Sequence, residues 1–272
     1  ASGSIIAYFV GAGMGRGGFC GITGQAMLVA PISANAIITS VFTLTNNVFN
    51  KKQKAYYITV ICSGFLCLLL AASRTALVAA MIAVLFYFYK VNKGQMGRFT
   101  KYMIGAGTIL VLLFPLWSPY LDNVKDKNEG SVKSGGITSS RDVHWKQRIN
   151  EWKSSPIFGI GFASVDTEVG EAGGANFDPV SGTVETGTSW LCVLSMTGFL
   201  GFSSLLALFI MAYIKASRFA KYDKRYSSYL VALLIFWAFH MMAEGYIFAG
   251  GSFLFFNVWL LLGCADAVNN FD

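Results

Sequence analysis

Long apolar runs constrain this chain more than any other feature of its sequence. They recur along the 272 residues, and most have about the 20 residues that a helix needs to cross a hydrocarbon core. Hydrophobic residues make up 54% of the chain and charged residues 13%, far from the balance of a water-soluble domain. We therefore predict an all-α fold, a polytopic integral membrane helical bundle. Its predicted spans are residues 25–44, 55–72, 75–91, 101–117, 189–214, 228–246 and 251–267.

Basic residues in the short connections predict how these spans are oriented. Lys and Arg accumulate in the cytoplasmic loops of membrane proteins. Twelve of the 21 Lys and Arg residues, with Asp223 as the only acid, fall in three connections, at residues 51–54, 90–101 and 215–225. Two predicted spans separate each of these connections from the next, so all three lie on the same side of the membrane. We assign that side to the cytoplasm.

The chain then divides into three segments. They are transmembrane helices over residues 1–117, one large extracytoplasmic loop over 118–188 and transmembrane helices over 189–272. We also expect N-terminal residues to precede Ala1, because the chain begins without Met and its first apolar piece, residues 5–10, is too short to span.

The large loop contains a stretch that predicts a short amphipathic helix near residues 140–154. Ser139 and Asp142 form a capping box that starts it, and Pro156 and Gly159 stop it. Four side chains recur at steps of four, three and four and share one helical face; they are Arg141, Trp145, Arg148 and Trp152.

This face has two interpretations. In the first, the tryptophans lie on the bilayer interface or on neighbouring helices, and Arg148 pairs with Glu151. In the second, the face binds an anion, because guanidinium groups hold phosphate bidentately.

The predicted topology places four arginines on the extracytoplasmic side, namely Arg16, Arg74, Arg141 and Arg148. Arg74 stands between two apolar helices, where a charge is costly unless it snorkels to the surface or is paired. Two carboxylates, Glu185 and Glu244, lie at the same membrane edge. They are candidates either for ion pairs with these arginines or for a catalytic role.

Several other patterns indicate no separate function. Residues 13–18 match GxGxxG, but they precede a predicted span and no βαβ unit surrounds them, so we do not expect a dinucleotide site. His144 and His240 have no Cys or acid at ligand spacing, and the five Cys residues form no CxxC pair, so we predict no metal site and no cofactor. The net charge of +7 comes mostly from loop residues and does not indicate nucleic acid as a partner.

Several short motifs resemble the O-antigen ligase and polysaccharide polymerase superfamily. They are Ser-Arg-Thr at 73–75, Ser-Ser-Arg-x-x-x-Trp at 139–145, Pro-x-x-Gly-x-Gly-Phe at 156–162, Leu191 followed by Gly198-x-x-Gly201, and Gly-Phe-Cys-Gly-Ile-Thr-Gly-Gln-Ala-Met at 18–27. Each motif is degenerate, but their order, spacing and sidedness together are specific, and the match covers most of the chain.

The resemblance implies a metal-independent glycosyltransferase in the bacterial inner membrane, with its active site facing the periplasm or the exterior. Its donor would be an oligosaccharide on undecaprenyl pyrophosphate, and Arg74 and Arg141 would hold the pyrophosphate. Arg148, Trp145 and Arg16 are expected to contribute to substrate binding. Membrane lipids and a chain-length regulator are further expected partners.

The resemblance also bears on the acceptor. Ligases of this superfamily have a His four residues before the position of Leu191, where this chain has Gly187. This departure favours an O-antigen or exopolysaccharide repeat-unit polymerase, in which Glu185 or Glu244 positions the acceptor. The alternatives are a ligase with a lipid or protein acceptor, a transporter of lipid-linked sugars and a non-catalytic assembly scaffold.

Overall fold

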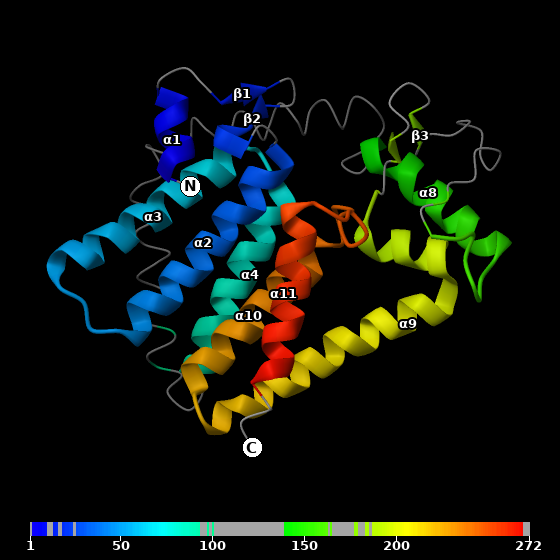
Figure 1. The fold of residues 1–272 in the computed structure, drawn as a ribbon. Coiled ribbons are helices and arrows are strands. Elements are labelled where there is room, and N and C mark those ends of the chain that lie inside the picture. The colour runs from blue at the N-terminus through cyan, green and yellow to red at the C-terminus, as the bar shows by residue number, and fades with distance from the viewer. Residues whose placement is uncertain are drawn as a thin grey trace. The chain divides into compact units, whose positions relative to one another are not determined.

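The computed structural model describes eleven parts of the chain, residues 2–9, 13–15, 18–23, 26–92, 97, 100, 139–162, 164, 177–178, 183–184 and 187–268. These parts are mainly helical (Figure 1). They belong to two compact units, one made of Ala1–Lys127, Lys215–Phe236 and Ala267–Asp272, the other of Asn128–Ile214 and Trp237–Asp266.

Four helices are long and apolar enough to cross a membrane, which confirms a polytopic helical membrane protein. They are Met27–Asn46, Lys51–Leu70, Arg74–Val91 and Ser189–Lys221, and Phe253–Ala267 is a shorter apolar helix. The predicted span at 101–117 lies outside the described residues. The prediction for 228–246 was too long at its end, because α10 (Lys224–His240) stops at His240. A turn follows it, in which the Glu244 N–H donates to the His240 carbonyl at 3.2 Å.

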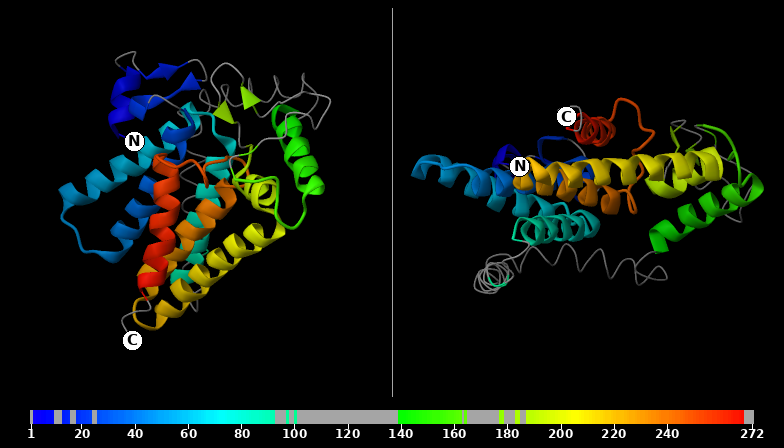
Figure 2. Two further views of the ribbon diagram at one scale, coloured as in Figure 1. Left: turned by 45° about the vertical axis from the view of Figure 1, so that its right-hand side comes forward. Right: turned by 90° about the horizontal axis from the view of Figure 1, so that it is seen from below.

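The first unit contains α2 (Ala26–Asn46), α3 (Lys51–Leu70) and α4 (Arg74–Val91), which lie side by side in Figures 1 and 2. Helix α3 starts four residues before the predicted span because Asn50 and Gln53 form a capping box. The Asn50 carboxamide accepts from the Gln53 N–H at 2.9 Å, and the Gln53 side chain accepts from the Asn50 N–H at 3.2 Å.

Small residues allow α2, α3 and α4 to approach closely. A Cβ atom at Gly64 of α3 would lie only 2.8 Å from Cγ1 of Ile37 on α2. Helix α4 buries Ala76, Ala80 and Ala83, which recur at steps of four and three and so share one face. Small residues on facing helices are the usual means of packing in a membrane, where apolar surface gains nothing by leaving lipid.

The N-terminal elements of this unit are short. They are α1 (Ser2–Phe9), the antiparallel pair β1 (Met14–Gly15) and β2 (Gly18–Phe19), and the 3-10 turn η1 (Gly21–Thr23). The GxGxxG stretch therefore contributes to a β-ladder, in which Gly15 pairs with Gly18. A second turn, η3 (Phe219–Lys221), precedes α10.

The second unit contains α8 (Ser139–Ser154), most of α9 (Ser189–Arg218) and most of α11 (Phe253–Ala267). A two-residue antiparallel pair, β3 (Phe177–Asp178) and β4 (Thr183–Val184), belongs to the same unit. The predicted helix near 140–154 is confirmed, and it ends before Pro156 as expected. The predicted span at 189–214 is also helical, but α9 is broken at Gly198, where φ is 64° and ψ is −164°. Figure 1 shows the change of direction.

The segment after α8 completes the hydrogen bonding at this break. Ile160 and Gly161 donate their N–H groups to the carbonyls of Ser195 and Met196, at 2.9 and 3.1 Å. In return, the Phe199 N–H donates to the Pro156 carbonyl at 2.8 Å. We call these bonds the α9 clamp.

Two glycines make this close approach possible. A Cβ atom at Gly198 would lie 2.2 Å from the Ile157 carbonyl oxygen, and one at Gly159 would lie 2.4 Å from the Met196 carbonyl carbon. Both residues also have a positive φ, 64° at Gly198 and 74° at Gly159, which favours glycine.

Candidate functional site

In the first unit, Arg74 stands at the N-terminus of α4. A tight turn precedes Arg74. In this turn the N–H of Ala72 donates to the Leu69 carbonyl at 2.9 Å, and Ala72 has a φ of 47°. Ser73 is the N-cap, and its side chain makes no capping hydrogen bond. The half-buried Arg74 therefore adds a guanidinium group to the positive end of a helix dipole. This combination suits an anion such as phosphate.

In the second unit, α8 buries a polar face. Gln147, Arg148 and Glu151 are 5%, 0% and 0% exposed. Arg148 donates from Nη1 to Oε2 of Glu151 at 2.9 Å and to Oγ of Ser195 at 3.4 Å, while Gln147 donates from Nε2 to Oε1 of Glu151 at 3.3 Å. The pair of Arg148 with Glu151, one of the two alternatives for this face, is therefore present, and Ser195 ties it to α9.

The two tryptophans of the same face differ in their hydrogen bonding. Trp152 donates from Nε1 to the Pro156 carbonyl at 3.2 Å, which connects α8 to the α9 clamp. Trp145 has its Nε1 buried, with no acceptor for it among the described residues. A buried indole N–H is usually hydrogen-bonded, so the Trp145 nitrogen is suited to meet an oxygen of a bound substrate.

His144 lies against the start of α9. A Cβ atom at Gly187 would be 3.3 Å from Cβ of His144, and both residues belong to the second unit. Gly187 has a φ of 69° and is followed by Thr188, whose hydroxyl accepts the Leu191 N–H at 3.1 Å and caps the helix. The backbone and Cβ atom of His144 on α8 therefore pack against Gly187.

The loop that carries Glu244 is attached to the same place. Ser189 donates its N–H to the carbonyls of Met241 and Glu244, both at 3.1 Å, and its hydroxyl to the Glu244 carbonyl at 2.7 Å. The Tyr246 N–H donates to that hydroxyl at 3.1 Å. We call the segment Gly187–Ser189 the α9 junction. It brings together His144 from α8 and the loop of the half-buried Glu244.

A buried aromatic cluster supports this loop. His240, 1% exposed, shares a hydrogen bond of 2.9 Å between its Nδ1 and the Tyr246 hydroxyl, and Trp237 packs edge-on against Tyr246. The sequence alone does not predict this contact, because His240 ends α10 and Tyr246 lies beyond the turn. Burial and the hydrogen bond indicate that His240 holds the loop in shape.

The side chains of three predicted site residues are not among those that the structure describes. Arg16 and Glu185 lie outside the described residues. Arg141 lies in the first turns of α8, one turn before His144 and Trp145, and the structure describes its place in the helix but not its side chain. Within the described residues, no three His, Cys, Asp or Glu side chains are grouped so as to hold a metal ion.

Comparison with known proteins gives one match. A family model described as O-Antigen ligase matches residues 58–189, a stretch that contains Arg74, α8 and the α9 junction. None of the curated proteins compared with the chain matches it.

Proposed function

We propose that this membrane protein polymerises lipid-linked oligosaccharide repeat units, because residues 58–189 match a family model described as O-Antigen ligase and the sequence resembles the polymerases of that superfamily. The match supports a glycosyltransferase-like enzyme whose substrate is a lipid-linked glycan. The proposal adds that the carrier is undecaprenyl pyrophosphate and that the reaction takes place at the outer face of the bacterial inner membrane, in line with the predicted loop orientation.

The observation that carries the proposal is the composition of the α9 junction and of α8 beside it. A single turn of α8 carries Arg141, His144 and Trp145, which are a cation, a titratable imidazole and a buried indole donor. His144 meets the α9 junction directly, and the Glu244 loop is hydrogen-bonded to it. A glycosyl transfer onto a hydroxyl needs these same types of group, one to hold the leaving phosphate and one to take a proton.

In the proposed reaction, an acceptor hydroxyl of one lipid-linked unit attacks the anomeric carbon of the growing chain. The bond from that carbon to the pyrophosphate oxygen breaks, and its electron pair remains on the pyrophosphate. The acceptor proton passes to a base, for which His144, Glu185 and Glu244 are the candidates. Arg74 and Arg141 stabilise the developing phosphate charge, most strongly when it is complete.

We assign the phosphate contact on α8 to Arg141 rather than to Arg148. Arg148 is fully buried and holds Glu151 and Ser195, so it could reach a phosphate only by leaving a buried carboxylate unpaired. Its proposed contribution to substrate binding is therefore indirect, through the position of α8. Trp145 and Arg16 remain proposed contacts to the substrate.

Arginine-to-lysine substitutions test the proposal. In a deletion strain, Arg74→Lys and Arg141→Lys should each reduce chain extension about 10- to 100-fold, because Lys keeps the charge but loses a charge-assisted hydrogen bond worth about 1.5–3 kcal/mol. Arg218→Lys, at an exposed arginine of α9, is the matched control and should extend chains normally. Glycan ladders are compared on gels at equal membrane levels of each variant.

The glycan ladders of the two variants distinguish three outcomes. Normal ladders in both variants would exclude the pyrophosphate contacts and favour an assembly scaffold. Failure of single repeat units to reach the outer face would favour a transporter. Single units that arrive but are not extended support the polymerase.

A ligase is the second candidate, and His144 is the observation that favours it. Gly187 stands where the resemblance predicts the His of a ligase, yet a histidine from α8, His144, has its Cβ atom beside this glycine. The glycine alone therefore does not separate the two activities. Purified protein with lipid-linked units as the only glycan should form longer lipid-linked chains if it is a polymerase, whereas a ligase would need an added lipid or protein acceptor. His144→Gln should slow the transfer step in either case.

A further inference from the structure

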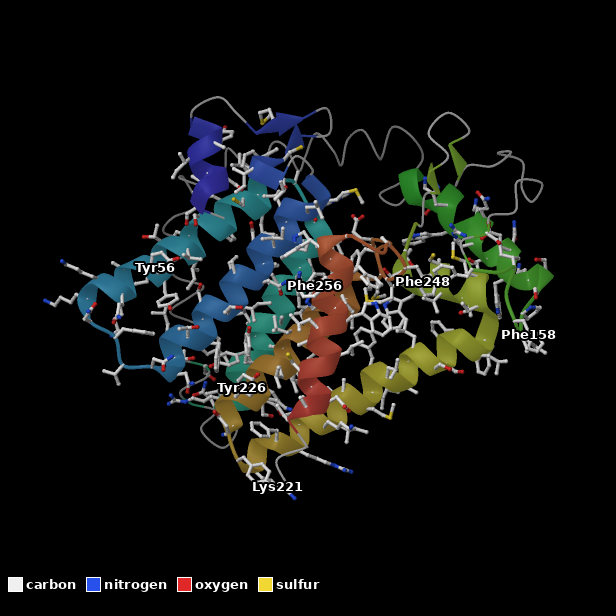
Figure 3. The ribbon with its side chains drawn as sticks, viewed as in Figure 1. Tyr56, Phe158, Lys221, Tyr226, Phe248 and Phe256 are labelled. Atoms are coloured by element: carbon white, nitrogen blue, oxygen red, sulfur yellow. The ribbon has the colours of Figure 1, made fainter. Side chains whose placement is uncertain are left out.

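The turn between α8 and the α9 clamp exposes large apolar side chains. Ile157 and Phe158 are 58% and 73% exposed, and Phe199 and Leu200, just beyond the break in α9, are 62% and 51% exposed. The two pairs are held together by backbone hydrogen bonds, from the Phe199 N–H to the Pro156 carbonyl and from the Leu200 N–H to the Ile157 carbonyl at 3.3 Å. We call these four side chains the elbow patch. Figure 3 shows Phe158 beyond the end of α8, at the edge of the unit.

The elbow patch continues into an apolar stripe on α9. Phe199, Leu206, Ile210 and Tyr213 follow one another at steps of seven, four and three, so they share one face of the helix. They are 62%, 40%, 49% and 41% exposed. Helix α9 is one of the candidate membrane spans, and an exposed apolar face on such a helix is its lipid-facing surface. The patch is therefore continuous with a surface that lipid covers.

The length of α9 places the patch near one boundary of the hydrocarbon core. Residues from Phe199 to Ile214 are uncharged, and Lys215 is the first basic residue that follows. At 1.5 Å per residue this run measures about 24 Å, slightly less than the hydrocarbon thickness of about 30 Å. With Lys215 at one interface, Phe199 lies close to the opposite interface, and the turn bonded to it lies at the same depth.

The backbone of this region tolerates an apolar medium. A broken helix inside a membrane must find partners for its freed N–H and C=O groups. The α9 clamp supplies them, since Ile160 and Gly161 donate to the Ser195 and Met196 carbonyls. On the preceding helix, Lys153 is exposed one turn before the patch and can extend its ammonium group to the phosphates of lipid headgroups.

We propose that the elbow patch inserts into the acyl-chain boundary of the bilayer leaflet opposite Lys215, so that the end of α8 is anchored in lipid although α8 does not span. The occupant is bilayer lipid, because the patch continues the lipid-facing stripe of α9, in which no residue from Phe199 to Ile214 is charged. The anchor would fix the depth at which α8 is held.

Site-directed spin labelling tests the insertion without using activity. Phe158→Cys carries a nitroxide in a Cys62→Ser, Cys264→Ser background, since Cys20, Cys67 and Cys192 are buried and protected from labelling. Ile210→Cys in the α9 stripe is the lipid control, and Lys221→Cys, at an exposed lysine of the basic connection after α9, is the aqueous control. The full chain is placed in nanodiscs of phosphatidylethanolamine and phosphatidylglycerol, without any polyprenyl lipid.

The label at 158 should collide more often with oxygen than with an aqueous nickel chelate, as at 210, and the ratio should reverse at 221. An aqueous pattern at 158 overturns the proposal. Protection from both reagents also overturns it, because a second copy or another part of the protein then covers the patch. A lipid-like pattern that appears only after polyprenyl phosphate is added overturns it too, since the patch would then bind the donor chain.

Discussion

Removal of Glu151 from beneath Arg148 should destabilise the second unit more than any other single change in α8. Both side chains are 0% exposed, and their ion pair has an N–O distance of 2.9 Å. Glu151→Gln leaves a buried guanidinium group without its carboxylate, and the loss of one partner of such a pair costs about 3–5 kcal/mol. For a domain of this size the expected decrease of the melting temperature is on the order of 10 °C.

The double variant Arg148→Met with Glu151→Leu is the matched control. It removes both charges and retains apolar volume, so it should recover most of the lost stability, as apolar replacements of buried pairs generally do. If the double variant is as unstable as Glu151→Gln, the cost comes from packing and the reasoning about the charge fails.

The assay uses cysteines that the fold already provides. Cys20, Cys67 and Cys192 are buried and react with a fluorogenic maleimide only when the protein unfolds, and the exposed Cys62 and the partly exposed Cys264 are replaced by Ser in every variant. Cys192 lies one turn before Ser195 on α9, so it reports on the unit that contains the ion pair.

The same pair of variants tests the assignment of Arg148. If Arg148 only positions α8, the stable double variant should still extend glycan chains. A double variant that is stable and inactive would show that Arg148 meets the substrate, and the phosphate contact of α8 would then have to be assigned again.

Three further predictions concern local structure and are checked with the same melting assay. Gly198→Ala should destabilise by at least about 2 kcal/mol, because it strains a positive φ and drives a Cβ atom into the Ile157 carbonyl oxygen; no change would mean that the α9 clamp is absent. Asn50→Ala should cost about 1 kcal/mol by removing the cap of α3, and Asn50→Asp should restore it. Gly64→Ala should cost about 1–3 kcal/mol by overpacking against α2, and Ile37→Ala should relieve part of that cost, whereas additive losses would contradict the contact.

The class of fold was predictable because it depends on local patterns. Length and hydropathy identify α2, α3, α4 and α9 whatever surrounds them, and the end of α8 before Pro156 follows from the proline. The errors at helix ends have particular causes. At the start of α3, the capping box at Asn50 extends the helix beyond its apolar run. At the end of α10, the chain after His240 forms a turn, and the carbonyls of this turn accept hydrogen bonds from Ser189.

The site was predictable only in part, because its contacts join distant segments. The pairing of Arg148 with Glu151 follows from their spacing on one helix, but its complete burial depends on α9. The contact of His144 with Gly187 and the break at Gly198 depend on how residues 139–161 dock on α9, which no local pattern encodes. For these two features, the glycines at 187 and 198 are the only indication in the sequence.

The break in α9 also has a consequence for the order of assembly. Residues 189–214 carry no charge and are mainly apolar, so they would enter a membrane as one continuous helix. The break gains its hydrogen-bond partners only when residues 156–161, synthesised earlier, dock against the inserted helix. Insertion of the span and formation of the break are therefore separate stages. The bend of α9 forms in the second stage, when residues 156–161 have docked.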